Sequence, residues 1–579
     1  YLSQLSEMID RDRNHPSVII WSIGNENEYG SNFQREYEFA KKVDPSRPVM
    51  FSYPGKVPKD STCYDIVSMH YVSYNGSVNQ LGIEMKDFGL PTIPVLHDEW
   101  SHVACYDTST LKTDLNIRNF WGESIKRMWD ACFDSDGGLG GAIWGYIDET
   151  FALPDTVVGY GPWGIIDTWR RKKPEFWLTK KAYSPVRVLQ THFASYERRN
   201  GLIVPLYNRF DHTNLKELQI RMTSGTSTRS IAAPDIPPHT KGSLIIPQNA
   251  LTGETVKLTF VHQGSLVVDE ELLRLGDKKG QAGFPAKRIR VTERERSIVA
   301  AGNGFTLTFS KQTGLLENGL VNGEPVILSG PYLHLITSGG QINWQADSVL
   351  DLTGSRWQLG SLSFKQSQQD LRVFVDGRSG TIDVHFEIVV DGNGEIHTSF
   401  ELPNLPEKFR EVGIRFLLSK DLNALSWERE ALWSVYTNDH IGRPTGMAPK
   451  FAPATQQEDY GAKPAHPWSL DTKDFYLYGK EGRPTGNNLP VPADFRTTKE
   501  NIFQYTLTDS KLHNGIRVTS DAAVAARAVV NADGTTTLVV MNDWCYRNLS
   551  WGNYGRVKKL PPLFRGEIYM QLVQGGAKK

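Results

Sequence analysis

The sequence predicts a multidomain protein that joins an α/β part to an all-β part. The chain has 579 residues, more than one hydrophobic core usually serves, so three or more domains are expected. Over residues 1–185, short apolar runs alternate with helical patterns, which indicates a parallel sheet covered by helices. From residue 186 onward, strand-like runs follow one another without helical periodicity, which indicates antiparallel β-sandwiches.

The first part contains a series of expected strands separated by expected helices. The strands are 18–26, 48–53, 65–71, 94–99 and 140–148, and the helical patterns cover 1–13, 31–43, about 76–88 and 117–132. A closed barrel of eight parallel strands needs roughly 250 residues, so about three strands are expected upstream if this sheet belongs to one. Because Tyr1 stands within a helical pattern, we expect the chain to begin inside a domain.

The second part divides into a small and a large sandwich. Residues 186–276 hold the expected strands 186–195, 201–210, 215–224, 241–248, 254–263 and 266–275. A polar, Gly-containing linker at 276–287 leads into residues 288–579, where alternating runs such as 305–309, 372–376, 382–390 and 536–541 predict one large sandwich. The sequence Gly-Arg-Pro-Thr-Gly occurs at 442–446 and at 482–486, and both copies are expected to form turns in long loops.

The composition narrows the class of partner. The chain has 64 Lys+Arg against 65 Asp+Glu, a net charge of -1, which argues against nucleic acid or an anionic membrane as the main partner. No apolar run approaches the ~18 residues that a membrane span needs. The four cysteines and the histidines lack metal-ligand spacing, so any bound ion would be held by oxygen. The 15 Trp, 22 Tyr and 25 Phe suit sugar-stacking clefts and β-sheet cores equally well.

Two carboxylates stand at the ends of expected parallel strands. Glu26 ends the apolar run 18–26, and Glu99 ends the run 94–99. In barrels of parallel strands, the C-terminal strand ends carry the chemistry. Two carboxylates facing one cleft can hydrolyse a glycosidic bond, one as the proton donor and the other as the nucleophile or general base. For either Glu alone a salt bridge or helix cap is the better interpretation, but the pair favours catalysis.

Strand alternation predicts which side chains share a face. In 18–26 it places Ser22, Gly24 and Glu26 together and turns Asn25 to the other face, while Glu28 falls in the following loop and is the weaker candidate. In 65–71 alternation turns Ser68 and His70 inward and leaves Tyr71 at the rim. In 94–99 it places His97 and Glu99 on one face.

Several aromatic and imidazole side chains are candidates for holding the sugar or the carboxylates. A His or Tyr beside a nucleophilic carboxylate can orient it through a hydrogen bond. For His70, His97 and His102 taken singly, a buried and satisfied imidazole remains the alternative. Trp144 stands near the end of the last strand, where its ring could lie beneath a bound sugar or pack in the barrel. The weaker candidates on the next loop are Asp148, Glu149 and Trp163.

Residues 10–26 read Asp-Arg-Asp-Arg-Asn-His-Pro-Ser-Val-Ile-Ile-Trp-Ser-Ile-Gly-Asn-Glu, which strongly resembles a motif of glycoside hydrolase family 2, especially its long β-galactosidases. In that family the final Glu is the acid/base, here Glu26, and the preceding Asn, here Asn25, binds the sugar 2-hydroxyl. The nucleophile is a Glu followed by an aromatic residue, which matches Glu99. Gly-Gly-Ala-Ile-Trp, ending at Trp144, matches the last barrel strand, and Gly-Ile-Ile-Asp at 164–167 matches the segment that closes the barrel.

The resemblance implies a fold for each part of the chain. Residues 1–185 correspond to strands 4 to 8 of a (β/α)8 TIM barrel, residues 186–276 to an immunoglobulin-like sandwich, and residues 288–579 to a large galactose mutarotase-like sandwich. The family's N-terminal jelly roll, first immunoglobulin-like domain and first barrel strands are not in this sequence. We therefore expect the missing N-terminal segment, supplied covalently or by a partner, to be needed for full activity.

The resemblance also implies further site residues. His102 stands where β-galactosidases place a sugar-contacting His, and Trp163 stands where they have an Asn that binds sodium and sugar. With His70, Tyr71 and Trp144, these residues form the expected sugar-binding set. An Mg or Na ion is the cofactor that the resemblance suggests, and Glu26 is the one usual magnesium ligand that this sequence retains.

The expected function is retaining exo-β-glycosidase activity on terminal non-reducing β-D-galactose, through a covalent glycosyl-enzyme. Two alternatives stay open: a family 2 hydrolase of another sugar, such as a β-glucuronide, and a non-catalytic glycan-binding remnant. The expected partner is a carbohydrate, a homo-oligomer is conceivable, and the bacterial cytoplasm or periplasm is the family-level location.

Overall fold

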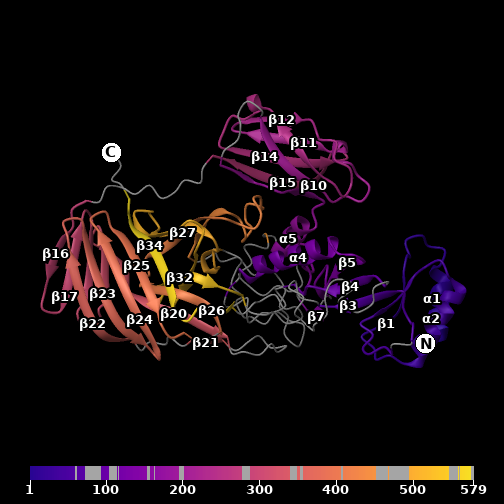
Figure 1. Ribbon diagram of the computed structural model, residues 1–579, viewed down its shortest axis with the longest axis horizontal. Coiled ribbons are helices and arrows are strands. Elements are labelled where there is room, and N and C mark those ends of the chain that lie inside the picture. The colour runs from indigo at the N-terminus through magenta and orange to yellow at the C-terminus, as the bar shows by residue number, and fades with distance from the viewer. Residues whose placement is uncertain are drawn as a thin grey trace.

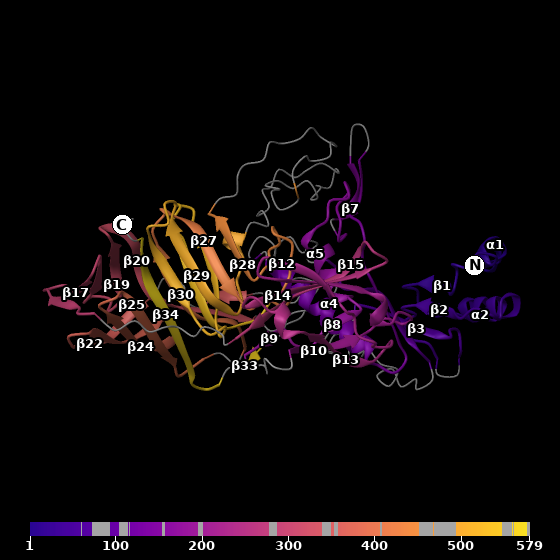
Figure 2. The same cartoon turned by 90° about the horizontal axis from the view of Figure 1, so that it is seen from above.

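A computed structural model gives the structure of the protein. It describes residues 1–58, 61–71, 93–103, 114, 116–152, 157–161, 163–194, 201–276, 287–338, 349–351, 357–405, 408–450, 467, 494–546, 558–559 and 561–575. Figure 1 shows a helix-covered sheet on the right, a small sandwich above the middle and a large sandwich on the left. Seen from above, the two ends of the molecule are the α1–α2 region and the β17–β22 region (Figure 2). The α/β part and the two all-β parts therefore separate as predicted.

The α/β part is built on one five-stranded parallel sheet in the order β1-β2-β3-β4-β5. The strands are β1 (Trp21–Asn25), β2 (Val49–Ser52), β3 (Ile66–His70), β4 (Val95–Trp100) and β5 (Gly138–Ile143). Each lies within or next to an expected strand. The bounds of the expected strand 140–148 are wrong at both ends, because β5 begins at Gly138 and ends at Ile143.

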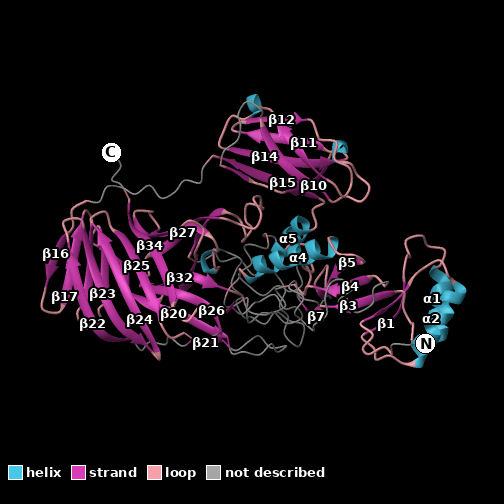
Figure 3. Cartoon of the chain, viewed as in Figure 1, coloured by secondary structure: helices cyan, strands magenta, loops and turns pink. Residues whose placement is uncertain are grey.

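Helices pack against this sheet, with α1 and α2 beside β1 and with α4 and α5 next to β5 (Figure 3). They are α1 (Leu2–Asp12), α2 (Ser31–Val43), α4 (Ile117–Phe133) and α5 (Pro174–Ala182), and the helix expected at about 76–88 lies outside the described residues. In α2, Phe33, Glu36 and Ala40 recur at helical spacing and are buried. Phe33 packs with Trp21 and Phe51 of the sheet, so the amphipathic pattern that predicts α2 also explains where it docks.

A hairpin that the sequence did not predict follows β5. It pairs β6 (Glu149–Ala152) with β7 (Val157–Gly161). Between β5 and the hairpin, the Gly145 N–H donates to the Trp163 carbonyl and the Asp148 N–H to the Ile166 carbonyl. These bonds hold residues 144–148 against residues 163–166, next to the end of the sheet.

The small sandwich consists of two antiparallel sheets and one short parallel contact. One sheet has the order β13-β10-β8 and the other β12-β11-β14-β15-β9. The strands are β8 (Val186–Val188), β9 (His192–Phe193), β10 (Leu202–Asn208), β11 (Gln219–Ser224), β12 (Ser227–Ile231), β13 (Lys241–Ile246), β14 (Thr255–His262) and β15 (Leu266–Leu275), with 3-10 turns at Leu215–Glu217 and Gln248–Ala250. Its core joins residues of both sheets, such as Val204 and Leu206 of β10 with Leu258 and Phe260 of β14. Strand β12 was not predicted from the sequence, and the single strand expected at 186–195 is wrong, because β8 and β9 belong to different sheets.

The large sandwich pairs a ten-stranded sheet with a nine-stranded sheet. The first contains β16 (Arg290–Glu293), β17 (Ser297–Gly302), β18 (Phe305–Ser310), β19 (Leu316–Val321), β20 (Glu324–Ser338), β21 (Val349–Asp351), β26 (Lys408–Leu418), β31 (Ala525–Val530), β32 (Thr536–Trp544) and β33 (Lys558–Lys559). The second contains β22 (Trp357–Gln366), β23 (Asp370–Ser379), β24 (Ile382–Asp391), β25 (Glu395–Leu402), β27 (Leu422–Arg429), β28 (Thr445–Pro449), β29 (Ile502–Asp509), β30 (Asn514–Thr519) and β34 (Phe564–Gln574). One apolar core fills the space between them.

The two copies of Gly-Arg-Pro-Thr-Gly have different outcomes. In the copy at 442–446, the first residues form a turn and the last two begin β28, so the expected turn is only half of that segment. The copy at 482–486 lies outside the described residues.

Buried contacts join the α/β part to the large sandwich. Trp433 and Tyr546 pack in the same apolar cluster as α4 and α5. At the start of α4, Asn116 donates a hydrogen bond to the Tyr546 hydroxyl. These contacts fix the α4 side of the parallel sheet against the all-β half. Within the described part of the chain, no helix is both long and apolar enough to cross a membrane.

Candidate active site

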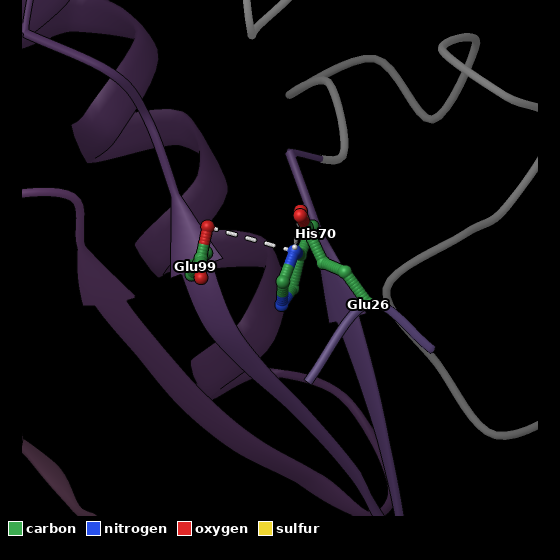
Figure 4. Close-up of side chains that lie close together, drawn as sticks. All are labelled: Glu26, His70 and Glu99. Carbon is green, nitrogen blue, oxygen red and sulfur yellow. Dashed lines mark hydrogen bonds and ion pairs between the residues drawn. The ribbon is translucent and has the colours of Figure 1, made fainter. Parts of the chain in front are cut away.

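The candidate residues gather at the C-terminal ends of the parallel strands. Glu26 directly follows β1, His70 is the last residue of β3, and Glu99 lies near the end of β4. Since parallel strands end at the same edge, the three side chains reach one another although they are far apart in sequence. Figure 4 shows Glu26 and Glu99 approaching the imidazole of His70 from different strands.

His70 contacts both glutamates through one ring nitrogen. Its Nδ1 lies 3.0 Å from Oε1 of Glu26 and 3.5 Å from Oε2 of Glu99. One carboxylate oxygen of Glu26 and one of Glu99 lie within 4.8 Å of each other and of that nitrogen. The side chain of Glu26 is 49 % exposed and that of Glu99 is 15 % exposed. The two carboxylates therefore share one site but differ in access to solvent.

The remaining contacts of Glu99 and His70 come from neighbouring strand ends. The Tyr71 hydroxyl donates to Oε2 of Glu99 at 2.5 Å. Asp98 lies behind the ring of His70, with its Oδ1 3.3 Å from Nε2, and it accepts a hydrogen bond from Ser68. The Ser52 hydroxyl lies 2.8 Å from the same Nε2. Asp98, Ser52 and Ser68 were missed as site residues, and the Asp-Glu dipeptide at a strand end was the signal that could have found Asp98.

The electrostatics follow from these contacts. Burial by itself lowers the pKa of His70, but the hydrogen bond with Asp98 and the charges of Glu99, Asp98 and Glu26 outweigh it, so the pKa is raised from 6.5. Burial also raises the pKa of Asp98, but the bonds from His70, Ser52 and Ser68 dominate and hold it below its usual range. These contacts thus favour the cationic form of the His70 ring.

The predicted faces of β1 are wrong after Ile23. Ser22 pairs with Met50 and Asn25 pairs with Ser52, so β1 uses one more residue than β2 over this interval. A Cβ on Gly24 would lie 2.7 Å from the Phe51 ring and 2.9 Å from the Phe33 ring, on the helix side of the sheet. Asn25 instead faces the site, where its Oδ1 accepts from the Ser52 hydroxyl at 2.8 Å.

The predicted pairing of His97 with Glu99 is wrong for the same reason. Ser68 pairs with Leu96 and His70 pairs with Glu99, which again leaves one extra residue, this time in β4. His97 is buried, and its ring stacks on that of Trp100 with centroids 5.9 Å apart. The irregularity turns both Asp98 and Glu99 toward His70.

The aromatic candidates form one continuous row. Tyr53 stacks on His70 at 5.2 Å, His70 meets the edge of Tyr71 at 5.7 Å, and Tyr71 stacks on His102 at 5.0 Å. The row continues from His102 to Trp163 at 5.8 Å and from Trp163 to Trp144 at 6.5 Å. The structure thus brings together every predicted sugar-binding aromatic and imidazole side chain, and it adds Tyr53.

Members of this row differ in accessibility. Trp144 is 39 % exposed, whereas Trp163 and His102 are buried. Burial lowers the pKa of His102 to about 3, so its imidazole is neutral over the physiological range. Tyr53, at 38 %, is about as exposed as Trp144, so these two rings are accessible at the two ends of the row, and Trp163 lies next to Trp144.

Asp148, a weaker candidate, has a structural role. Its Oδ1 lies 2.5 Å from Nζ of Lys173 and accepts the Gly164 N–H at 2.8 Å. Burial raises the pKa of Asp148 to about 6, although Lys173 acts in the opposite direction. This pair fixes the segment that carries Trp163.

The residues around Glu26 do not fit the expected Mg or Na ion. Both ions prefer a shell of oxygen ligands. In the described part of the chain, Glu26 shares its surroundings with Glu99 and with a ring nitrogen of His70, which donates to the Glu26 carboxylate. That donor set is poor in oxygen.

Comparisons with known proteins agree with the strand-end motif. Residues 1–124 match the family "Glycosyl hydrolases family 2, TIM barrel domain". A β-galactosidase of Vibrio vulnificus (strain CMCP6) is 33 % identical over 155 residues, which is 26 % of this chain and 13 % of that protein. A β-galactosidase of Psychromonas ingrahamii is 23 % identical over 394 residues, covering 57 % of this chain and 35 % of that protein. The chain thus spans 13 % to 35 % of the length of these two relatives.

Two solved structures also align with this chain. They are a putative aldose 1-epimerase from Escherichia coli K12, at 14 % identity over 49 % of this chain and 98 % of that one, and a galactose 1-epimerase from Lactobacillus acidophilus NCFM, at 12 % identity over 50 % of this chain and 100 % of that one. Both TM-scores are 0.26.

Residues 1–124, which include Glu26 and Glu99, match the TIM barrel domain of glycosyl hydrolase family 2. The sequence relatives of the chain are β-galactosidases.

Proposed function

We propose that this protein is a retaining exo-β-glycosidase that releases terminal non-reducing β-D-galactose. The observation that carries the proposal is the approach of the two carboxylates, with oxygens of Glu26 and Glu99 within 4.8 Å of each other. Retaining enzymes hold their carboxyl groups about 5–5.5 Å apart, whereas inverting enzymes leave roughly 6.5–9.5 Å for a water molecule. Galactose as the sugar is supported by the names of the relatives.

The proposed reaction has two steps. In the first, the Glu99 carboxylate attacks the anomeric carbon while the protonated Glu26 gives its proton to the leaving oxygen, so a glycosyl–Glu99 ester forms and the glycosidic bond breaks. In the second, Glu26 takes a proton from water, and the water oxygen displaces Glu99 from the same carbon. The Tyr71 hydroxyl, bonded to Oε2 of Glu99, leaves the other oxygen of that carboxylate for the attack.

The proposal includes the division of the chain into three domains. Residues 1–185 form part of a TIM barrel, residues 186–276 an immunoglobulin-like sandwich, and residues 288–579 a mutarotase-like sandwich. The sheet order leaves β1 and β5 at the edges of the parallel sheet. Glu26 stands at the end of edge strand β1, which accounts for its exposure, and further barrel strands beside β1 would shield it. Full activity is therefore expected only when such strands are present.

The test is the stereochemistry of the first product and the rescue of two variants. Proton NMR of 4-nitrophenyl β-D-galactoside hydrolysis should show β-galactose first. With azide, Glu26→Ala should yield the β-galactosyl azide and Glu99→Ala the α-galactosyl azide, because azide replaces the attacking water in one and the nucleophile in the other. α-Galactose as the first product would refute retention. Full activity in Glu99→Gln would refute the nucleophile, and faster release from a β-glucuronide would refute galactose.

A further inference from the structure

His70 was expected to bind the sugar, but its surroundings describe a different role. The residue is only 3 % exposed. Its ring is stacked on Tyr53 with an interplanar angle of 13° and meets Tyr71 edge-on at 73°. A ring packed in this way on two sides is fixed in orientation, and it offers little surface to a ligand.

Both ring nitrogens are already used by protein groups. Nδ1 faces the carboxyl groups of Glu26 and Glu99, and because the ionised Glu99 can only accept, Nδ1 carries a hydrogen. Nε2 faces the Asp98 carboxylate, which can only accept, as well as the Ser52 hydroxyl. Nε2 therefore carries a hydrogen as well.

Asp98 is itself held in place by Ser68. Ser68 donates to Oδ1 of Asp98, the same oxygen that lies 3.3 Å from Nε2 of His70. Adjacent residues of β4 thus act on opposite ends of one ring, since Asp98 contacts Nε2 and Glu99 approaches Nδ1. This order resembles the general arrangement in which an outer carboxylate orients an imidazole that serves an inner reacting group.

We propose that His70 is the positioning residue for both catalytic carboxylates, and that Asp98 fixes the orientation of its ring. The inference rests on the proposed function, since it assigns a role within that reaction. The Nδ1–H of this ring lies between Glu26 and Glu99 and sets the spacing that the two-step mechanism needs. His70 touches no sugar in this arrangement, so it acts through the glutamates.

Two substitutions separate the roles of the two ring nitrogens. The amide nitrogen of Asn can occupy the place of Nδ1, and that of Gln can occupy the place of Nε2. His70→Asn should keep a donor toward Glu26, whereas His70→Gln should keep only the contacts with Ser52 and Asp98. The proposal predicts that kcat falls about 10- to 100-fold in His70→Gln and clearly less in His70→Asn, the scale for hydrogen bonds to charged groups. Asp98→Asn should also lower kcat, because the counter-charge is lost.

The KM and the inhibition constant of free galactose distinguish positioning from sugar binding. Positioning predicts that both constants change less than about twofold in these variants while kcat falls. A rise in KM and a weaker inhibition constant with unchanged kcat would show that His70 binds the sugar and would overturn the proposal. Equal kcat in His70→Asn and His70→Gln would also overturn it, since Nδ1 would then have no special role.

Two further measurements keep this inference separate from the proposed function. Covalent labelling of Glu99 by a 2-deoxy-2-fluoro-β-galactoside, read by intact mass, tests the nucleophile in the unaltered protein. If the unaltered protein is labelled but kcat is undiminished in every His70 variant, only the positioning role is refuted. If the unaltered protein is not labelled, the proposed function is refuted. Crystal structures of the unaltered protein and His70→Gln need no turnover. The carboxylates of Glu26 and Glu99 should move apart in the variant, and unchanged positions would refute the inference.

Discussion

Replacing Arg527 with methionine is expected to destabilise the large sandwich more than any single surface change. Arg527 is buried in β31, and its guanidinium contacts Glu411 at 3.0 and 2.7 Å and Asp114 at 3.3 Å. Burial by itself would raise the pKa of Glu411, but Arg527 and His334 hold it well below its usual range. Without Arg527, the negative charges of Glu411 and Asp114 would remain largely shielded from water and would lose the positive charge that they contact.

The expected size follows from the cost of an uncompensated buried charge. Breaking a buried ion pair by removing one partner costs about 3–5 kcal/mol. With an unfolding entropy of about 2.1 cal/mol/K per residue over roughly 290 residues, that free energy corresponds to a Tm lowered by about 5–8 °C. Differential scanning calorimetry would measure the shift of the transition that belongs to this sandwich.

A matched control is available on the surface of the same sandwich. Arg565 pairs with Glu401 at 2.7 Å, but its side chain is 68 % exposed. Exposed pairs contribute about 0–1 kcal/mol, so Arg565→Met should lower the Tm by less than about 2 °C. Equal shifts in Arg527→Met and Arg565→Met would refute the reasoning. Adding Glu411→Gln to Arg527→Met should recover part of the loss, because it removes a stranded charge.

Three more outcomes follow from the site. Tyr71→Phe removes the donor to Glu99 and should lower kcat by about 10- to 150-fold with little change in KM, measured by steady-state kinetics. The pKa of His102 is about 3 in the folded chain, whereas an unperturbed imidazole has a pKa of 6.5. As the pH falls, His102 therefore takes up a proton in the unfolded chain before it does so in the folded chain. Stability should therefore drop by about 1.4 kcal/mol per unit between about pH 6 and 4, and urea denaturation of His102→Gln should show a shallower slope. Gly141→Ala would drive a Cβ into the Trp100 ring, so we expect about 1–3 kcal/mol of destabilisation in the same assay, and an unchanged midpoint would contradict the tight packing.

Apolar periodicity was sufficient to predict the parallel sheet and its helices. Strand β1 and helix α2 lie within the run 18–26 and the helical pattern 31–43. They could be predicted because a buried strand and an amphipathic helix each leave an apolar pattern in the local sequence. The two sandwiches were predicted for the same reason. The hairpin β6–β7 and the strand β12 were missed, because short pairings depend on their partners more than on their own pattern.

The candidate site was predicted by residue type but not by geometry. Glu26, Glu99 and the aromatic row lie together, as strand-end chemistry and the family motif implied. The faces of Asn25 and His97 were wrong, because strict alternation cannot reveal an extra residue in one strand of a pair. Asp98 was missed for the same reason, since alternation turned it away from the site that it in fact supports.

The extra residues in β1 and β4 have a consequence for anyone who would transplant this site. Each strand carries one residue too many just before its carboxylate, and this surplus lets neighbouring side chains of β4 serve the same ring. Copying Asn-Glu and Asp-Glu onto two regular strands would send half of those groups into the helix layer. A designer would have to transfer the irregular backbone together with the side chains, and a one-residue deletion upstream of either carboxylate should abolish the site even though every catalytic residue remains in the sequence.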